Sequence, residues 1–239
     1  MEERVFLTGG TGFLGTELAA RLCRMPDIKV YALVRADDPE EAYHRLRGVW
    51  QHDKILFDSI GETVLPVCGD FTMRGLGLGK DDQKMIEDTA TLVIHAGAET
   101  GFTRSRRELE RTNLTGTANM LTFAGGIRDL RRFVYISTAY VAGQKEGLVT
   151  EEEPVATEFS SYYEKSKAKA EARVRASGIP YSIVRPGMIV GDSGTGWIRN
   201  FNTVYYVLKL ILLRKMTVLP VSPETSLNIV PVDYDADSV

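Results

Sequence analysis

Tyr163 and Lys167, four positions apart in the segment SSYYEKSKAKAEA, are a pair of residues that could take part in proton transfer. On a helix this spacing places both side chains on one face. A free tyrosine has a pKa of about 10, and a nearby ammonium would lower that pKa and tune tyrosine as a proton donor or acceptor. Tyr162 is the neighbouring candidate, but the residue four positions after it, Ser166, carries no charge. The spacing favours Tyr163, and an exposed helix face is the alternative interpretation.

Two hydroxyl groups, those of Ser137 and Thr138, follow an apolar run in VYISTAYVAG. If that run is a buried strand, both stand at its carboxyl end, where open α/β sheets place their ligand crevice. A hydroxyl at this edge can hydrogen-bond a carbonyl oxygen. Capping of the following loop is the alternative role.

A glycine-rich stretch near the start, FLTGGTGFLG, joins an apolar run to a helical pattern. Gly9, Gly12 and Gly15 form G-x-x-G-x-x-G. Glycine permits positive φ in a tight turn and lets a pyrophosphate approach the backbone, and the N-terminus of the following helix attracts the anion. A tight strand-to-helix turn also needs glycine, but the position after the first strand of a βαβ unit favours dinucleotide binding.

The end of the second predicted strand, in ALVRADD, distinguishes between two dinucleotides. An acidic residue there would bind the ribose 2′-hydroxyl of NAD. This chain has Arg35, twenty positions after Gly15, and a guanidinium suits a 2′-phosphate. The pattern therefore favours NADP over NAD. The alternatives are a solvated arginine, or Asp37 or Asp38 reaching the ribose.

Short apolar, β-branched runs alternate with helical patterns, and this alternation predicts the elements that position these residues. Runs that are apolar throughout are typical of parallel strands buried on both faces. The runs occupy residues 4–9, 28–34, 63–70, 91–98, 131–138, 181–187 and 227–232, and the predicted helices occupy 15–25, 39–50, 80–89, 106–126 and 162–178. Right-handed crossovers then give an α/β fold with a doubly wound parallel sheet. We expect one Rossmann-type domain over residues 1–239.

The composition is that of an ordinary globular protein, with 44% hydrophobic residues, 26% charged residues and a formal net charge of −3. The slightly acidic balance predicts no nucleic-acid partner. Cys23 and Cys68 lie in apolar surroundings, which favours reduced thiols, and the sequence has no Cys/His cluster, so no metal site is expected. The charged N-terminus lacks a signal-peptide pattern, and we expect a cytoplasmic protein.

The most apolar late stretch, residues 204–221, is interrupted by Lys209, Arg214 and Lys215. It is too short and too charged to span a bilayer, so no stable membrane insertion is expected. An amphipathic helix packed in the core is favoured over a helix on a membrane surface.

Several short motifs occur in an order that resembles a known superfamily. TGGTGFLG, HAGAE, NLTGT, STAYVAG, YYEKSK and RPGMIVGDSGTG together resemble the extended short-chain dehydrogenases/reductases over nearly the whole chain. The details GTGFLG, LVRA, GDFT and VGDSGTG are most similar to the thioester reductases and fatty acyl-CoA reductases, the male-sterility-type branch. The resemblance implies an NADP-dependent reductase with a Rossmann fold.

The resemblance also implies which residues hold the cofactor. The dinucleotide loop would comprise Gly9, Thr11, Gly12, Phe13, Leu14 and Gly15, with Thr11 beside the phosphates. Arg35 would contact the 2′-phosphate, Asp70 and Phe71 would flank the adenine, His95, Ala96 and Gly97 would line the adenosine half, and Pro186, Gly187 and Ile189 would pack near the nicotinamide. Taken alone, His95 would instead be interpreted as a hydrogen-bonded core histidine.

The implied catalytic set is Thr138, Tyr163 and Lys167, with Asn113 in the helix that supports the site and Ser137 as a structural neighbour. NADPH would deliver hydride to the carbonyl carbon of an acyl thioester while Tyr163 protonates the developing oxyanion, which Thr138 helps to hold. Lys167 would bind the nicotinamide ribose and keep the tyrosine acidic. Loss of thiol leaves an aldehyde, and a second hydride transfer would give an alcohol. CoA or an acyl carrier protein would carry the acyl group.

Enzymes of this kind continue into a C-terminal substrate-binding portion, which we expect to be small or truncated here, with residues 192–225 contributing to the substrate side. On this expectation the chain is a fragment or excised domain, or substrate recognition lies largely elsewhere. Residues 197–219 would form one wall of an acyl or pantetheine channel, or pack in the core.

Two other functions stay open at this point. The first is an NAD-dependent nucleotide-sugar epimerase or dehydratase of the same superfamily, which Arg35 and the VGDSGTG loop disfavour. The second is a non-catalytic NADP-binding regulator, which the set Thr138, Tyr163 and Lys167 disfavours because a sensor has no need of it.

Overall fold

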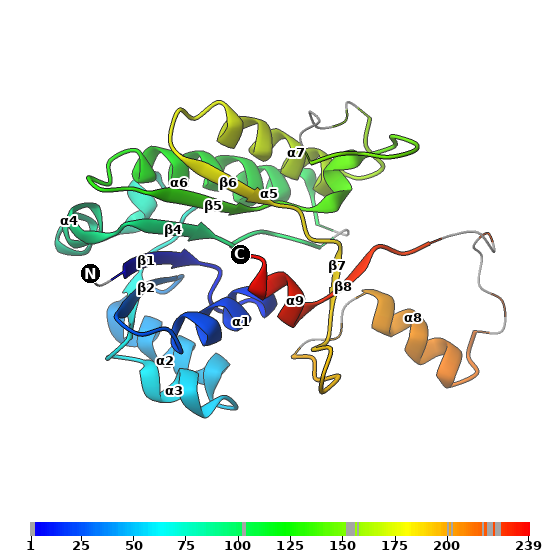
Figure 1. Ribbon diagram of the computed structural model, residues 1–239, viewed down its shortest axis with the longest axis horizontal. Coiled ribbons are helices and arrows are strands. Elements are labelled where there is room, and N and C mark those ends of the chain that lie inside the picture. Colours follow the sequence, from blue (N-terminus) through cyan, green and yellow to red (C-terminus); the bar gives the residue numbers. More distant parts are fainter. Residues whose placement is uncertain are drawn as a thin grey trace.

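Six parallel strands form the centre of the fold in the computed structural model (Figure 1), which describes residues 3–101, 104–151, 156, 158–199, 201, 203–216, 218, 222 and 226–239. The strands are β1 (Glu3–Thr8), β2 (Ile28–Val34), β3 (Val64–Cys68), β4 (Leu92–His95), β5 (Arg132–Ile136) and β6 (Tyr181–Val184). Their spatial order, β3-β2-β1-β4-β5-β6, reverses between β1 and β4. The predicted doubly wound parallel sheet is confirmed. Such a reversal places a ligand crevice at the carboxyl ends of the strands.

Helices cover both faces of this sheet because successive strand residues point to opposite sides. On one face, Val5 and Leu7 pack in a buried cluster with Leu18 and Trp50. On the other face, Phe6 packs in a second cluster with Ile86 and other buried side chains. The helices of the first layer are α1 (Phe13–Leu22), α2 (Pro39–Trp50) and α3 (Lys54–Ser59); those of the second are α4 (Lys80–Thr89), α6 (Thr117–Ala124) and α7 (Tyr162–Arg175).

Local sequence fixes where several helices begin. The side chain of Asp38 accepts a hydrogen bond from the first turn of α2, and Pro39 follows it at the first helical position. Ser105 and Glu108 form a reciprocal capping box on the short helix α5 (Arg106–Leu109). Ser161 caps α7, so the helix that carries Tyr163 and Lys167 begins at Tyr162.

The predicted helix over residues 106–126 is present without interruption from Arg106 to Ala124, but its middle part is π-helical. A π-helical segment, η2 (Glu110–Gly116), lies between α5 and α6. A Cβ on Gly116 would meet the ring of Phe71 at 2.5 Å, so the segment packs closely on that ring. Such segments are frequent at functional sites. Two 3₁₀ turns, η1 (Arg74–Gly77) and η3 (Ala139–Ala142), follow β3 and β5.

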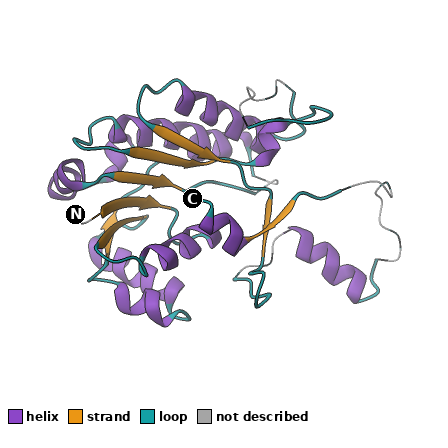
Figure 2. Ribbon diagram, in the orientation of Figure 1, coloured by secondary structure: helices purple, strands orange, loops and turns teal. Residues whose placement is uncertain are grey.

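The last predicted strand, over residues 227–232, pairs outside the central sheet. β8 (Ile229–Pro231) lies parallel to β7 (Met188–Val190), and the two form a separate small sheet (Figure 2). The chain then enters α9 (Val232–Asp237), which packs against α1. Arg21 on α1 holds this helix through the carboxylate of Asp237, at 2.5 Å, and the carbonyl oxygen of Asp233, at 3.0 Å.

The expectation of a core helix within residues 204–221 is wrong for its helical part. α8 (Thr203–Leu212) stands apart from the central sheet, at the right of Figure 1, and most of its large apolar side chains are exposed. Tyr206 is 63% exposed and Leu212 is 81% exposed. A core position would need an element packed over this face, and the described chain supplies none. Residues 217 and 219–221 lie outside the described chain. No helix in the described ranges has the length and apolar character that a membrane span requires.

Candidate active site

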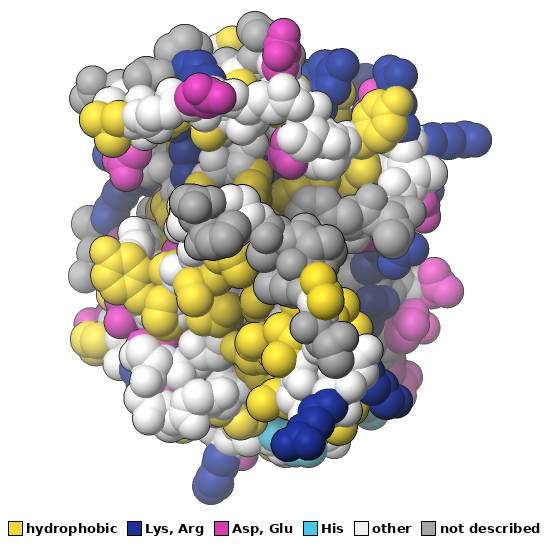
Figure 3. All heavy atoms as spheres, turned by 90° about the vertical axis from the view of Figure 1, so that its right-hand side faces the viewer, with side chains coloured by type: hydrophobic (Ala, Val, Ile, Leu, Met, Phe, Trp, Pro, Cys, Tyr) yellow, Lys and Arg dark blue, Asp and Glu magenta, His cyan; other side chains and the backbone are white. Residues whose placement is uncertain are grey.

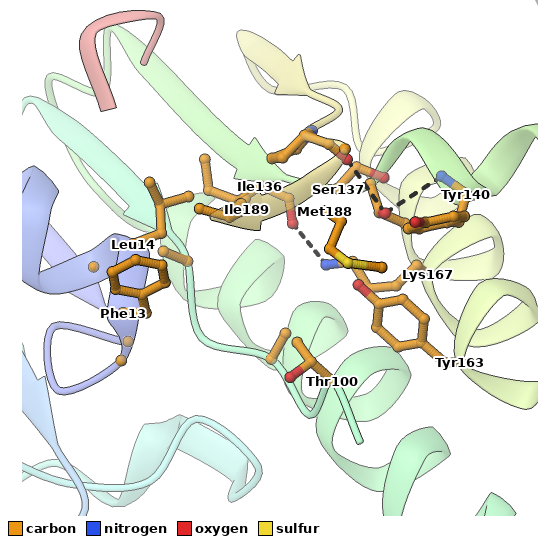
Figure 4. A pocket seen from close by; sticks show the side chains of 18 residues that line it. Phe13, Leu14, Thr100, Ile136, Ser137, Tyr140, Tyr163, Lys167, Met188 and Ile189 are labelled. Carbon is orange, nitrogen blue, oxygen red and sulfur yellow. Dashed lines mark hydrogen bonds between the residues drawn. The ribbon is translucent and has the colours of Figure 1, made fainter. Parts of the chain in front are cut away.

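A cavity of about 420 Å³ lies at the carboxyl ends of the strands, where the sheet order reverses (Figure 4). Phe13 and Leu14 of α1 border it on one side, and Tyr163 and Lys167 of α7 on the other. The full lining consists of Gly9, Gly12, Phe13, Leu14, Gly15, Ala96, Ala98, Thr100, Ile136, Ser137, Thr138, Tyr140, Tyr163, Lys167, Pro186, Gly187, Met188 and Ile189. The face toward which the strands run gathers hydrophobic side chains across its middle (Figure 3). The glycine loop and the tyrosine–lysine pair therefore share one cavity.

The glycine loop has no room for a side chain at Gly9 or Gly15. Gly9 has a φ of +77°, and a Cβ there would lie 2.6 Å from the backbone of Ala96. A Cβ on Gly15 would lie 2.6 Å from the carbonyl carbon of Gly9. Gly12 caps α1 and donates its N–H to the carbonyl oxygen of Gly9 at 2.8 Å. The indole of Trp50 fixes the turn from outside by donating to the carbonyl oxygen of Gly10 at 3.1 Å.

Tyr163 is buried at the cavity wall, with 8% of its surface exposed. Burial raises the pKa of its phenol, and a hydrogen bond with the side chain of Thr138 opposes that rise. The sequence-based expectation of a lowered tyrosine pKa is therefore wrong. The pKa rises because burial removes water from around the phenolate, and this desolvation disfavours the charged form. A buried neutral phenol remains a proton donor at neutral pH.

Lys167 is also buried, with 2% of its surface exposed. Its Nζ donates a hydrogen bond to the carbonyl oxygen of Ile136 at 2.6 Å and lies 4.3 Å from the centre of the Tyr135 ring. Burial lowers the pKa of this lysine to about 7, although the carboxylate of Glu171 opposes the shift. The ammonium therefore titrates close to neutral pH, and small changes around it alter its charge.

The two hydroxyls after β5 have different partners. The hydroxyl of Thr138 accepts a hydrogen bond from the backbone N–H of Tyr140 at 3.3 Å and donates one to the carbonyl oxygen of Pro186 at 3.4 Å. It thus caps η3 and also lines the cavity. Ser137 donates to the carboxylate of Glu171 at 2.8 Å, away from Tyr163.

Asn113 lies in the π-helical segment and does not line the cavity. Its amide accepts the N–H of Glu99 at 2.8 Å and donates to the carbonyl oxygen of Glu99 at 2.9 Å. It also donates to the hydroxyl of Ser166, next to Lys167, at 2.9 Å. Asn113 therefore joins α7 to the loop that carries Thr100.

The residues proposed for the adenosine half lie beyond this cavity, apart from Ala96. The guanidinium of Arg35, 60% exposed, lies 3.1 Å from the carboxylate of Asp70, so these two come together at the ends of β2 and β3. Asp38 uses its carboxylate to cap α2. Thr11 is half-buried in the glycine loop, outside the cavity lining.

His95 is a buried bridge between elements. One ring nitrogen lies 2.7 Å from the hydroxyl of Thr8 and the other 3.1 Å from that of Thr117. Burial, with a smaller repulsion from Lys167, lowers its pKa to about 3. The neutral ring, one nitrogen a donor and the other an acceptor, fits both contacts. The ring of Phe71 packs edge-on against it at 5.2 Å, and Thr8 also accepts the N–H of Gly97. The interpretation of His95 as a hydrogen-bonded core histidine fits this geometry.

Sequence reasoning did not single out five residues of the lining: Ala98, Thr100, Ile136, Tyr140 and Met188. Each lies in or directly beside a motif that the sequence displays: Met188 begins β7, and the other four lie at the end of a strand or in the segment after it. The sequence signal that could have found most of them is their position after a predicted strand. Such a position indicates that a residue faces the cavity, but it does not indicate the role of that residue. The described residues contain no cluster of three or more His, Cys, Asp or Glu side chains suited to a metal ion.

An open parallel sheet of this strand order, with a glycine turn at the reversal and a Tyr-x-x-x-Lys pair in the same crevice, agrees with the resemblance to the extended short-chain dehydrogenases/reductases. Residues 7–239 match the family model described as male sterility protein. The chain belongs to this family, within the thioester reductase branch.

Similar proteins include curated relatives and a solved structure. Aldehyde reductase lnaA of Aspergillus flavus is 34% identical over 250 residues, which cover 98% of this chain and 23% of lnaA. The non-canonical nonribosomal peptide synthetase cpsA of Aspergillus campestris is 33% identical over 255 residues, which cover 100% of this chain and 24% of cpsA. The chain thus spans about a quarter of the length of these two relatives. The crystal structure of the terminal R domain from the myxalamid PKS-NRPS biosynthetic pathway is 30% identical, with a TM-score of 0.88, covering 99% of this chain and 61% of that one.

Proposed function

We propose that the protein reduces an activated acyl group, carried as a thioester, to an aldehyde with NADPH as the hydride donor. The observation that carries this proposal is the shared cavity, because the glycine loop and Tyr163, Lys167 and Thr138 line the same space. A dinucleotide on the loop would then present its reactive end to the proton donor. One cavity thus combines a cofactor site with a site for proton transfer to a carbonyl oxygen.

The glycine loop fits the phosphates of a dinucleotide. A Cβ at Gly9 or Gly15 would collide with backbone, so the turn is drawn tight, and Gly12 opens the N-terminus of α1 toward the cavity. Phe13, Leu14, Thr11 and Gly15 complete this loop. Arg35 beside Asp70 is assigned to the 2′-phosphate, since a guanidinium binds phosphate through charge-assisted hydrogen bonds. Phe71, His95, Ala96 and Gly97 support the adenosine half.

The nicotinamide end is assigned to the segment after β6. Pro186, Gly187 and Ile189 line the cavity opposite Tyr163. Gly187 lies against the neighbouring strand, where a Cβ would approach the carbonyl oxygen of Asn228 to 2.6 Å, so the segment is anchored from behind. When bound, NADPH supplies a hydride to the carbonyl carbon of the acyl thioester.

The protein's own groups then handle the charge that develops on oxygen. Tyr163 donates a hydrogen bond, and then its proton, to the carbonyl oxygen of the substrate, and the hydroxyl of Thr138 shares that interaction. Lys167 anchors the ribose and favours the phenolate left behind. Asn113 positions α7 rather than touching the reacting atoms. The carbon–sulfur bond breaks, a thiol leaves and an aldehyde remains.

The substrate class follows from the chemistry of the site and from the relatives. The lining is largely apolar apart from the hydroxyl and ammonium groups already named, as an acyl chain requires. The names of cpsA and of the myxalamid R domain place both in nonribosomal peptide or polyketide synthesis. We therefore assign a thioester on a carrier protein as the substrate, with acyl-CoA as the other form. We assign residues 1–239 to one dinucleotide-binding unit, with residues 192–225 on the substrate side.

A panel of acyl thioesters tests the proposal. The purified chain is mixed with NADPH and acyl-CoA or acyl-pantetheine substrates, NADPH oxidation is followed by absorbance, and the aldehyde or alcohol is identified by mass spectrometry, with NADH as control. We expect thiol release, aldehyde formation and a preference for NADPH. NADPH binding without turnover on any thioester contradicts the enzymatic proposal and favours the regulator. Tight retention of NAD with turnover of a nucleotide sugar favours the epimerase.

A further inference from the structure

Glu171 is a fully buried carboxylate one helical turn after Lys167, and the proposed reaction does not use it. One oxygen, Oε2, accepts the hydroxyl of Ser137 at 2.8 Å and Nε of Arg185 at 3.1 Å. The other, Oε1, accepts Arg185 at 2.6 Å and Arg175 at 3.0 Å and 3.1 Å. These bonds lower the pKa of Glu171 below its ordinary value although burial opposes them, so the group is ionised at neutral pH.

This cluster joins three elements that border the cavity. Glu171 belongs to α7, Ser137 follows β5 and Arg185 follows β6. The next residue after Ser137 is Thr138, and the next after Arg185 is Pro186, and both line the cavity. The carboxylate therefore holds two strand ends in place immediately beside the residues that face the substrate.

The charge of Glu171 also acts on Lys167. The groups around this ammonium are Tyr163 and Glu171 on α7, Tyr135 on β5 and His95 on β4. The two tyrosines are neutral because burial raises their pKa, and His95 is neutral because burial lowers its pKa. Among the described groups that act on Lys167, Glu171 supplies the negative charge that favours its protonated form.

We propose that Glu171 is a positioning residue of the active site: it fixes the ends of β5 and β6 against α7, and its charge maintains the buried ammonium of Lys167. The inference rests on the proposed function, since it concerns the lysine assigned to the cofactor ribose. A carboxylate placed one turn behind the lysine offsets part of the desolvation that burial imposes. Without it the cluster would keep two arginines and no carboxylate, and the lysine would lose its proton at lower pH.

Glu171→Gln tests this, because glutamine keeps the size of the side chain and removes its charge. NADPH binding is titrated by fluorescence between pH 6 and 9, and thioester turnover is followed over the same range. We expect NADPH binding about tenfold weaker than in the wild type at pH 8, and close to wild type at pH 6, as for an acidic shift of about one unit in the lysine. Identical pH profiles for variant and wild type would falsify the inference.

Two further variants separate charge from stability. Val174→Ala removes a fully buried apolar group from the same helix, so it is expected to lower the melting temperature and leave the pH profile unchanged. Arg175→Gln removes a partly exposed cation from the cluster, and is expected to move the alkaline limb to higher pH. Arg175→Gln keeps the inference testable if Glu171→Gln does not fold. An alkaline limb at the same pH as in the wild type would overturn the inference. NADPH titration of the wild type reports on this inference even where no thioester is turned over, so the two proposals fail separately.

Discussion

The ammonium of Lys167 donates a hydrogen bond to the carbonyl oxygen of Ile136, 31 residues earlier in the chain, with 2.6 Å between Nζ and the oxygen. The bond closes α7 onto the end of β5, the strand that leads directly into Thr138. One tertiary contact therefore brings the Tyr163–Lys167 pair and the hydroxyl to the same cavity before any ligand binds. A proton donor that is held in place in this way contributes more than a mobile one.

Replacement of Tyr163 by phenylalanine tests whether its phenolic proton is needed for the reaction. The ring keeps its packing, so the fold and NADPH affinity are expected to stay near those of the wild type, while thioester reduction falls by about 10²–10⁴-fold. Steady-state turnover and a cofactor titration on the same preparation check this. Tyr162→Phe is the matched control, because that neighbouring side chain is 56% exposed and is expected to tolerate the change. Equal turnover in Tyr163→Phe and the wild type would remove the tyrosine from the mechanism.

Arg35→Ala tests the assignment of the 2′-phosphate. Because a hydrogen bond to a charged group contributes about 1.5–3 kcal/mol, the Kd for NADPH is expected to rise by roughly ten- to a hundredfold. The Kd for NADH, which lacks the phosphate, is expected to stay unchanged and serves as the internal control. Fluorescence titration with both cofactors measures the ratio. Equal weakening for the two would mean that the arginine supports the fold at Asp70 rather than reading the phosphate.

Much of the fold was predictable because its signals are local. The apolar runs that become β1 to β6, and the glycine spacing of Gly9, Gly12 and Gly15, report backbone requirements that a few neighbouring residues fulfil. The same holds for Tyr163 and Lys167, whose shared helix face needs only their spacing. The sequence therefore predicted the doubly wound sheet and the glycine loop at its ligand crevice, whereas the place of the tyrosine–lysine pair in that crevice was implied by the family resemblance.

The remainder depends on tertiary burial, which no short pattern encodes. Nothing around Tyr163 in the sequence indicates that its phenol is desolvated, so the direction of its pKa shift was wrong. In the sequence, Glu171 resembles a solvated charge on a polar helix. In the structure it is fully buried and forms an ion pair with Arg185, 14 residues away in the chain. The periodicity of α8 indicates an apolar face without saying what covers it, and the structure leaves Leu212 exposed.

The neutral, buried His95 should make stability depend on pH. In the unfolded chain it protonates near its ordinary pKa of about 6.5, whereas in the folded protein its pKa is about 3. The unfolded state therefore binds more protons between these values, and stability is lost as the pH falls below about 6.5, by up to about 1.4 kcal/mol per pH unit. Urea unfolding of the wild type and His95→Asn at pH 7, 6 and 5 checks this.

The variant is expected to be less stable at pH 7, because Thr8 and Thr117 lose their ring partner, but to show a flatter decline with acid. His44→Asn, on the exposed face of α2, is the control and should retain the wild-type slope. Parallel slopes for wild type and His95→Asn would contradict a buried neutral ring.

Asp235 on α9 should destabilise the protein at neutral pH. It is 5% exposed, its Oδ2 has no hydrogen-bond partner among the described residues, and burial raises its pKa to about 6. An unfolded aspartate ionises near a pKa of about 3.9, so the folded state binds more protons between these values and stability falls as the pH rises through them. Asp235→Asn is expected to raise the melting temperature at pH 7.5 and to have little effect at pH 4. Thermal unfolding at both pH values measures the difference.

Asp237→Asn is the matched control on the same helix. Its carboxylate is exposed and paired with Arg21, and such surface pairs contribute about 0–1 kcal/mol, so this variant should lower the melting temperature slightly or leave it unchanged. A stabilisation by Asp235→Asn that is as large at pH 4 as at pH 7.5 would come from packing, and would contradict the buried charge. A pH-dependent gain confined to Asp235 instead means that α9 docks on α1 against an electrostatic cost. The apolar contacts of Val232 and Ala236 in the same buried cluster must then outweigh that cost.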